Sequence, residues 1–104
     1  MEIDIAKSLR AVVREGSVSI GARNALKSVQ REEAQLILLA SNCPEKFRDE
    51  IKLRRVPAVD LGVNSVELGS MCGKPFIISM LAVIDPGSSD IMSLREKEVD
   101  YDRS

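Results

Sequence analysis

Two runs of apolar residues constrain the fold of this chain most. The first covers residues 35–40 (QLILLA) and the second covers residues 77–84 (IISMLAVI), and nearly every position in them is apolar. A strand with one face in water alternates apolar and polar residues, whereas a strand covered on both faces reads as a continuous apolar run. We therefore expect two central strands of a sheet, with other elements packed on both faces.

Helical patterns surround these runs. Apolar residues recur at helical spacing in residues 2–14 before Gly16, and again in residues 22–29 after the glycine at position 21. A charged helix is expected from Pro44, at its first helical position, to about Arg54. Further helix starts are Asn64, with Glu67 three residues later as in a capping box, and Asp90.

Two shorter strands complete the pattern. Residues 17–20 (SVSI) alternate polar and apolar side chains, and residues 56–59 (VPAV) read as a strand whose Pro57 suits a sheet edge. Helices thus alternate with four strands, and two of these strands must be covered on both faces. The predicted fold class is α/β, a three-layer α/β/α sandwich formed by residues 1–95 as one domain. Residues 96–104 are expected to be a frayed acidic tail.

Charge is unevenly distributed, although the net charge is only −1. Residues 1–55 hold eleven basic and eight acidic side chains, whereas residues 56–104 hold four basic and eight acidic ones. A local basic face is possible, but a broad basic surface is not.

Location and redox state follow from what the sequence lacks. No run reaches the roughly 18 apolar residues of a membrane span, and the amino terminus is acidic where a secretory signal is basic, so we expect a cytoplasmic protein. Cys43 and Cys72 have no metal-ligand companions and the chain has no histidine. We expect reduced thiols, with no metal and no cofactor.

Catalysis is not expected. No histidine base, glycine-rich phosphate loop or carboxylate pair is present. The one candidate is Cys43, which precedes a helix whose amino-terminal dipole would lower the pKa of its thiol. The alternative, a small residue at a strand end, is the interpretation we prefer.

Three turns share a composition that suits ligand binding. Residues 21–24 (GARN), 41–44 (SNCP) and 73–76 (GKPF) each combine small or rigid residues with a polar or aromatic side chain, and we expect each to join a strand to a helix. Such turns can cluster at one edge of an α/β sheet, where helix amino termini and basic side chains bind phosphate. Ordinary solvated turns would have the same composition.

The ordered set of motifs resembles a known family. Residues 20–23 (IGAR), the strand at 36–40 followed by Asn42 and Pro44, residues 65–69 (SVELG) with 73–75 (GKP), and residues 81–87 (LAVIDPG) look together like large-subunit ribosomal protein L-thirty-e. This archaeal and eukaryotic family belongs to the L-seven-Ae superfamily, whose members bind kink-turn RNA. The resemblance covers residues 1–95 and implies a mixed sheet.

The resemblance also implies an RNA-binding site at these turns. The implied residues are Gly21, Ala22, Arg23, Asn24, Lys27, Asn42, Pro44, Glu67, Gly69, Lys74 and Phe76. Asn42 and Glu67 would bond base edges, Lys27 would reach a phosphate, and Phe76 would stack on an unpaired base. Phe76 could instead belong to the core, because an apolar run follows it.

The implied function is structural. The protein would bind ribosomal RNA and neighbouring ribosomal proteins, take no small-molecule substrate, contact no membrane and be monomeric off the ribosome. The rival interpretation is a relative that binds kink-turns in small ribonucleoproteins or on messenger RNA. The chain departs from the family pattern in residues 44–57, which are about one helical turn shorter, and in its acidic tail.

Overall fold

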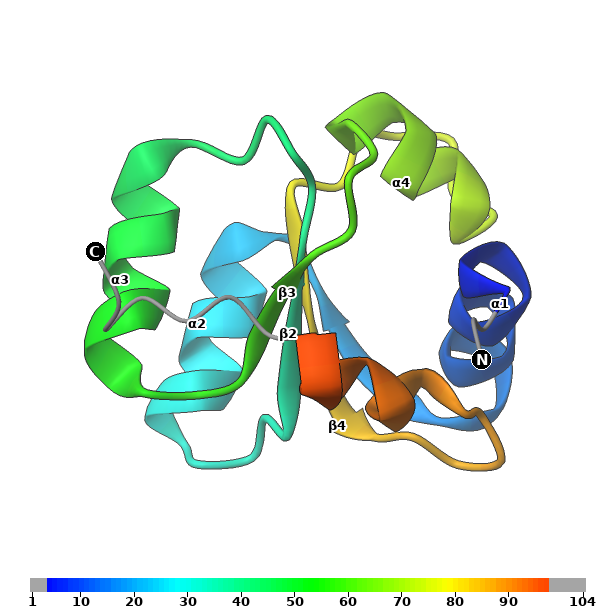
Figure 1. Cartoon of the computed structure of the whole chain (residues 1–104), viewed down its shortest axis with the longest axis horizontal. Coiled ribbons are helices and arrows are strands. Elements are labelled where there is room, and N and C mark those ends of the chain that lie inside the picture. Colours follow the sequence, from blue (N-terminus) through cyan, green and yellow to red (C-terminus); the bar gives the residue numbers. More distant parts are fainter. Residues whose placement is uncertain (1–3, 98–104) are drawn as a thin grey trace.

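A four-stranded mixed sheet lies between two layers of helices (Figure 1). The structure, a computed structural model, describes residues 4–97. Its strands are β1 (Ser17–Ile20), β2 (Leu36–Leu39), β3 (Ala58–Asp60) and β4 (Met80–Asp85), in the order β1-β4-β2-β3. β4 is antiparallel to β1 and β2, and β2 is parallel to β3. The predicted α/β/α sandwich with a mixed sheet is confirmed.

The helices divide between the two faces of the sheet. α2 (Ala22–Gln30) and α3 (Glu45–Arg54) cover one face, and α1 (Ile5–Glu15), α4 (Ser65–Met71) and the 3-10 helix η1 (Ile91–Lys97) cover the other (Figure 1). Among the described residues, no helix combines the length and the apolar character that crossing a bilayer requires.

The two apolar runs supply the centre of both cores. In β2, Leu36 and Leu38 pack in the core on the α1 side, while Ile37 and Leu39 pack in the core on the α2 side. Successive side chains of a strand point to opposite faces, so a strand that is buried on both sides must be apolar throughout. Each of the four residues of β2 is fully buried, which confirms the prediction from the first run.

The second run begins its strand later than predicted. β4 starts at Met80, and the preceding Ile77 lies in a loop with 62% of its surface exposed. An apolar residue in an exposed loop has the same sequence pattern as a strand residue, so the boundary could not be recognised.

Helix boundaries agree with the sequence patterns to within a few residues. α1 begins at Ile5, where the Asp4 side chain accepts a hydrogen bond from the Lys7 N–H. Pro44 is the amino-terminal cap of α3 rather than its first helical residue. The predicted cap Asp90 instead accepts a hydrogen bond from the Ser8 hydroxyl, and Ser89 Oγ accepts from the Ile91 N–H at 3.2 Å.

The edge strand and the tail complete the comparison. β3 lies at a sheet edge as predicted, and Pro57 precedes it, where its carbonyl accepts a hydrogen bond from the Ile37 N–H. η1 continues through Lys97, so the first two residues of the predicted tail are helical. The remainder of that prediction, residues 98–104, lies outside the described residues.

Candidate nucleic-acid interface

Four loops meet at one end of the sandwich, the upper edge in Figure 1. They are the β1–α2 turn at Gly21 and the loops at residues 40–44, 61–64 and 72–79. Backbone hydrogen bonds fix their relative positions. Gly21 N–H donates to Met80 O (2.9 Å), on the β4 residue directly after the last loop, Ala40 N–H donates to Ser79 O (2.9 Å), and Ser41 N–H donates to Val63 O (2.7 Å). The loop end is therefore one connected surface, and we use this name for it below.

The sheet topology places these loops together. The parallel strands β2 and β3 end at the same edge, and β4, antiparallel to β2 and β1, begins there. The carboxyl ends of three strands thus face the same side as the entry into β4. Side chains just after β1, β2 and β3 are brought together although up to forty residues separate them in sequence.

The β1–α2 turn requires a glycine. Gly21 is the amino-terminal cap of α2 with φ 97°, a conformation that L side chains rarely adopt. Arg23 and Asn24 follow in the first turn with exposed side chains, and Asn24 Nδ2 donates to Ile20 O at 3.0 Å. Ala22 is half-buried, and Lys27 is exposed one turn after Arg23.

Asn42 links two of the loops. Its Oδ1 accepts from the Ser65 N–H at 2.8 Å, and its Nδ2 donates to Ser65 Oγ at 3.1 Å. Asn42 thereby satisfies one of the free N–H groups at the start of α4. An amide has two N–H donors and an acceptor oxygen with two lone pairs. The exposed Asn42 therefore keeps one donor and one acceptor site for a ligand.

Arg48 fixes the loop at residues 40–44 through the backbone carbonyls of that loop. Its guanidinium donates to Ala40 O (2.8 Å), Ser41 O (3.2 Å) and Cys43 O (3.2 Å), which are the carbonyls on both sides of Asn42. It also pairs with Asp60 Oδ2 at 2.8 Å, and Asp60 Oδ1 accepts from the Gly62 N–H at 2.8 Å. The ion pair, whose side chains are 16% and 30% exposed, thus fixes the loops that follow β2 and β3.

Cys43 is not an activated thiol. It is buried beside Pro44, which is exposed at the cap of α3, and burial raises its pKa above the ordinary value, although the Arg48 charge acts in the opposite direction. The thiolate, which is the nucleophile, is therefore disfavoured. Both cysteines are free and buried, as the small-residue interpretation predicts. Among the side chains that the structure describes, no group of three His, Cys, Asp or Glu could hold a metal ion.

The start of α4 has the predicted capping box. Asn64 Oδ1 accepts from the Glu67 N–H at 2.9 Å, and Glu67 Oε1 accepts from the Asn64 N–H at 3.2 Å. Glu67 is exposed at the loop end, so its carboxylate has further lone pairs for a ligand.

Gly69 explains why this short helix contains a glycine. The segment that returns from α4 to β4 crosses it so closely that a Cβ at position 69 would lie 2.0 Å from the carbonyl oxygen of Phe76. The prediction that residues 73–76 join a strand to a helix was wrong. They follow α4, Gly73 ends the helix with φ 75°, and the segment then runs back along α4.

The returning segment exposes apolar side chains at the loop end. Phe76 is 52% exposed, and Ile77 and Val66 are 62% and 64% exposed. The core alternative for Phe76 is therefore wrong. Lys74 is half-buried after the carboxyl end of α4, which is about 10 Å long, so it lies at the margin of the loop end. Gly69 is buried and acts through backbone packing.

Comparison with known proteins settles the relationship. Residues 3–93 match the model of the Ribosomal protein L7Ae/L30e/S12e/Gadd45 family. The chain belongs to this family.

Several relatives in the family are similar to the chain over most of its length. A Methanosarcina mazei protein named large ribosomal subunit protein eL30 is 40% identical over 93 residues, 89% of this chain and 90% of the relative. Proteins of the same name from Methanothrix thermoacetophila and Methanocaldococcus jannaschii are 41% identical over 92 residues and 37% identical over 100 residues. These alignments cover 88% and 92% of this chain, and 89% and 91% of the relatives.

Three residues that form or support the loop end were absent from the sequence prediction. Val66 and Ile77 were overlooked because one lies beside the capping residues and the other lies in an apolar run. Arg48 lies in a helix of mixed charge, where no local pattern separates it from its neighbours. The one available signal was Val66, an apolar residue within the predicted capping box.

Proposed function

We propose that this chain is a structural protein of the large ribosomal subunit that binds ribosomal RNA at a sharply bent internal loop, and that it catalyses no reaction. Family membership and the name shared by its relatives support the ribosomal role. The observation that carries the RNA-binding proposal is the loop end itself, where four loops are fixed to one another by hydrogen bonds.

The groups on this surface match the chemistry of an RNA loop. Arg23 and Lys27 offer cations for phosphates, and Asn42 and Glu67 offer the donor and acceptor groups that read base edges. Phe76 offers an exposed ring on which an unpaired base can stack. Gly21 and Ala22 let the RNA approach the backbone at the start of α2, and Asn24 and Pro44 are the further contacts that we propose.

A preformed surface suits a chain of low net charge. A bent RNA brings its phosphates together and turns bases outward, so a rigid surface recognises shape and a few bases with few ion pairs. The affinity should therefore depend less on salt than that of a protein with a basic tail. We expect a monomer off the ribosome, with neighbouring ribosomal proteins as its other partners.

A titration against two RNAs tests this function. The wild-type protein should bind a kink-turn RNA at least tenfold more tightly than a fully paired duplex of the same length. Arg23→Ala and Asn42→Ala should each weaken kink-turn binding roughly 5- to 150-fold, the range for losing about 1–3 kcal/mol. Arg14→Ala, which removes an exposed charge from α1, is the matched control and should bind as the wild type does.

Equal affinity for the two RNAs would refute the proposal. Wild-type affinity of both loop variants would place the binding surface elsewhere. Co-sedimentation with large subunits in high salt then separates the ribosomal role from that of a kink-turn protein in small ribonucleoproteins or on messenger RNA.

A further inference from the structure

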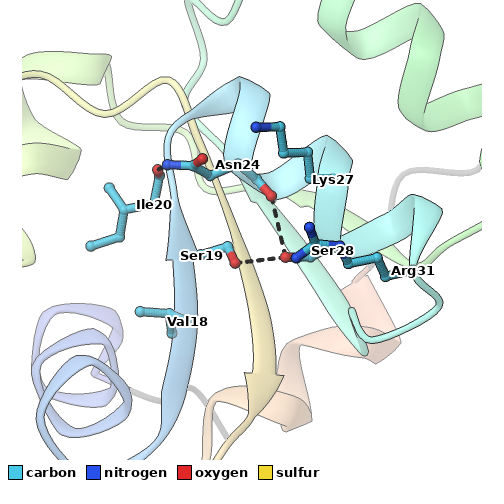
Figure 2. Close-up of a pocket in the computed structure, with 7 residues that line it drawn as sticks. All are labelled: Val18, Ser19, Ile20, Asn24, Lys27, Ser28 and Arg31. Carbon is cyan, nitrogen blue, oxygen red and sulfur yellow. Dashed lines mark hydrogen bonds between the residues drawn. The ribbon is translucent and has the colours of Figure 1, made fainter.

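A groove next to the loop end contains Lys27, which the proposed site already uses, and a second cation, Arg31, which it does not use. It lies between the edge strand β1 and α2 and has a volume of about 350 Å³ (Figure 2). Its lining consists of Val18, Ser19, Ile20, Asn24, Lys27, Ser28 and Arg31. None of these residues is acidic, so the groove has a net positive charge.

The charge follows a single line along α2. Arg23 and Lys27 are four residues apart on α2, so their side chains share one face of the helix and differ by about 6 Å in height. Arg31 follows Lys27 at the same spacing, as the carboxyl cap of α2. Residues 22–31 contain no acidic side chain. Within the part of the chain whose side chains are described, neither Lys27 nor Arg31 forms an ion pair. Figure 2 shows Lys27 on α2 and Arg31 at the carboxyl end of this helix.

The floor of the groove offers a hydrogen-bond acceptor. Ser28 Oγ donates its one proton to Asn24 O at 3.2 Å, so Ser19 must donate in the 2.6 Å contact between the two hydroxyls. Both protons are then used, and Ser19 Oγ retains lone pairs that can accept a hydrogen bond. The groove therefore combines cations at its rim with a hydroxyl acceptor at its floor.

We propose that this groove is a second RNA contact, which binds the sugar-phosphate backbone of the helical stem beside the bent loop, with Arg31 as its outermost phosphate contact. The proposal rests on the proposed function, because the line of charge begins at Arg23 on the loop end. Phosphates would lie against Lys27 and Arg31, and a ribose 2′-hydroxyl could donate to Ser19.

An acidic protein segment fits the groove less well. Such a segment would add to β1 through the open edge of that strand. The edge carbonyl nearest the loop end, Ile20 O, already accepts a hydrogen bond from Asn24. The acidic side chains of such a segment have no proton to donate to Ser19 Oγ, so only its backbone N–H groups could use this acceptor. RNA supplies phosphates for Lys27 and Arg31 and a ribose 2′-hydroxyl for Ser19.

The experiment measures kink-turn binding as a function of salt with two RNAs. One RNA has a long stem on the α2 side of the bend, and in the other that stem is cut back to the few pairs needed to hold the bend. Arg31→Gln removes the charge and keeps the carboxyl cap of α2, which Arg31 makes through its backbone N–H. Arg10→Gln, an exposed position on α1, is the matched control.

With the long stem, the slope of log K against log salt should decrease in magnitude by about 0.7 to 0.9 in Arg31→Gln, the loss of one phosphate contact. With the short stem, Arg31→Gln and the wild type should have equal slopes. Arg10→Gln should match the wild type on both RNAs. Far-ultraviolet circular dichroism of the variants confirms that α2 is intact.

Two results would overturn the proposal. The first is an unchanged slope for Arg31→Gln on the long stem. If that variant also lost its association with ribosomal subunits, the groove would bind an acidic protein segment instead. The second is an equal decrease in slope on both RNAs. Arg31 would then act through the overall positive potential of the protein rather than through a contact with the stem. Failure of the proposed function would differ from both, because the wild type would then not distinguish the bend from a duplex.

Discussion

Substitution of Gly69 by alanine sets two physical effects against each other. In a helix, alanine is favoured over glycine by about 1 kcal/mol, so propensity alone predicts a more stable protein. The structure predicts the opposite, because the new Cβ would lie 2.0 Å from Phe76 O and real Cβ contacts below 3.0 Å essentially never occur. The backbone at Phe76 or α4 would have to move by about 1 Å in a well-packed region.

The overlap should exceed the helix gain. Overpacking typically costs about 1–3 kcal/mol, and a rigid backbone carbonyl places this position at the upper end of that range. After the gain in propensity, we expect Gly69→Ala to lower the free energy of unfolding by about 2 kcal/mol, or the melting temperature by about 10 °C. Kink-turn affinity measured below the transition should also fall, because Phe76 is displaced.

Urea denaturation followed by circular dichroism measures the stability change. The midpoint should decrease with an unchanged slope, which separates lost stability from a change in the denatured state. Ser70→Ala, at an exposed position of the same helix, is the control and should change stability by less than about 0.5 kcal/mol. A Gly69→Ala protein as stable as the wild type would show that the returning segment does not press on α4.

Three further predictions concern other parts of the molecule. Arg48→Met removes the donor to Ala40 O and the partner of Asp60. It should lower the free energy of unfolding, measured by urea denaturation, by about 2–3 kcal/mol and should weaken kink-turn binding. Wild-type stability together with wild-type binding would contradict the positioning role of Arg48. Burial raises the pKa of Cys72 to about 11 from 9.0, so the unfolded chain loses the thiol proton first and stability should decrease as pH rises from about 9 to 11. That decrease should be smaller in Cys72→Ala. Leu38→Asp should abolish folding, because a charge would be buried without a partner in β2, whereas Leu53→Asp, at a position 76% exposed, should leave the circular dichroism spectrum unchanged.

The sheet was predictable because its signal is local. A strand buried on both sides needs apolar residues at consecutive positions, and β2 satisfies this at every residue. The same rule misplaced the start of β4, since Ile77 is apolar for a reason other than burial in the sheet. The capping box of α4 was predictable for the same local reason: its two partners are three residues apart.

From local patterns alone, the geometry of the site was predictable only where residue type restricts the backbone. Gly21 was recognised as a turn residue, and its positive φ explains why. The contact of Gly69 with Phe76, the pairing of Asn42 with Ser65 and the support from Arg48 all join elements distant in sequence. Their geometry depends on packing, so no local pattern could reveal it.

The opposite end of the sandwich is formed by other turns. The connections into β1, β2 and β3, and the turn after β4, lie there, one strand length from the loop end (Figure 1). Changes in those turns can therefore alter the contacts made at that opposite end without changing the shape of the loop end. A fluorescent dye or immobilisation tag at the position of the exposed Arg55, between α3 and β3, would leave the loop end accessible to its partner.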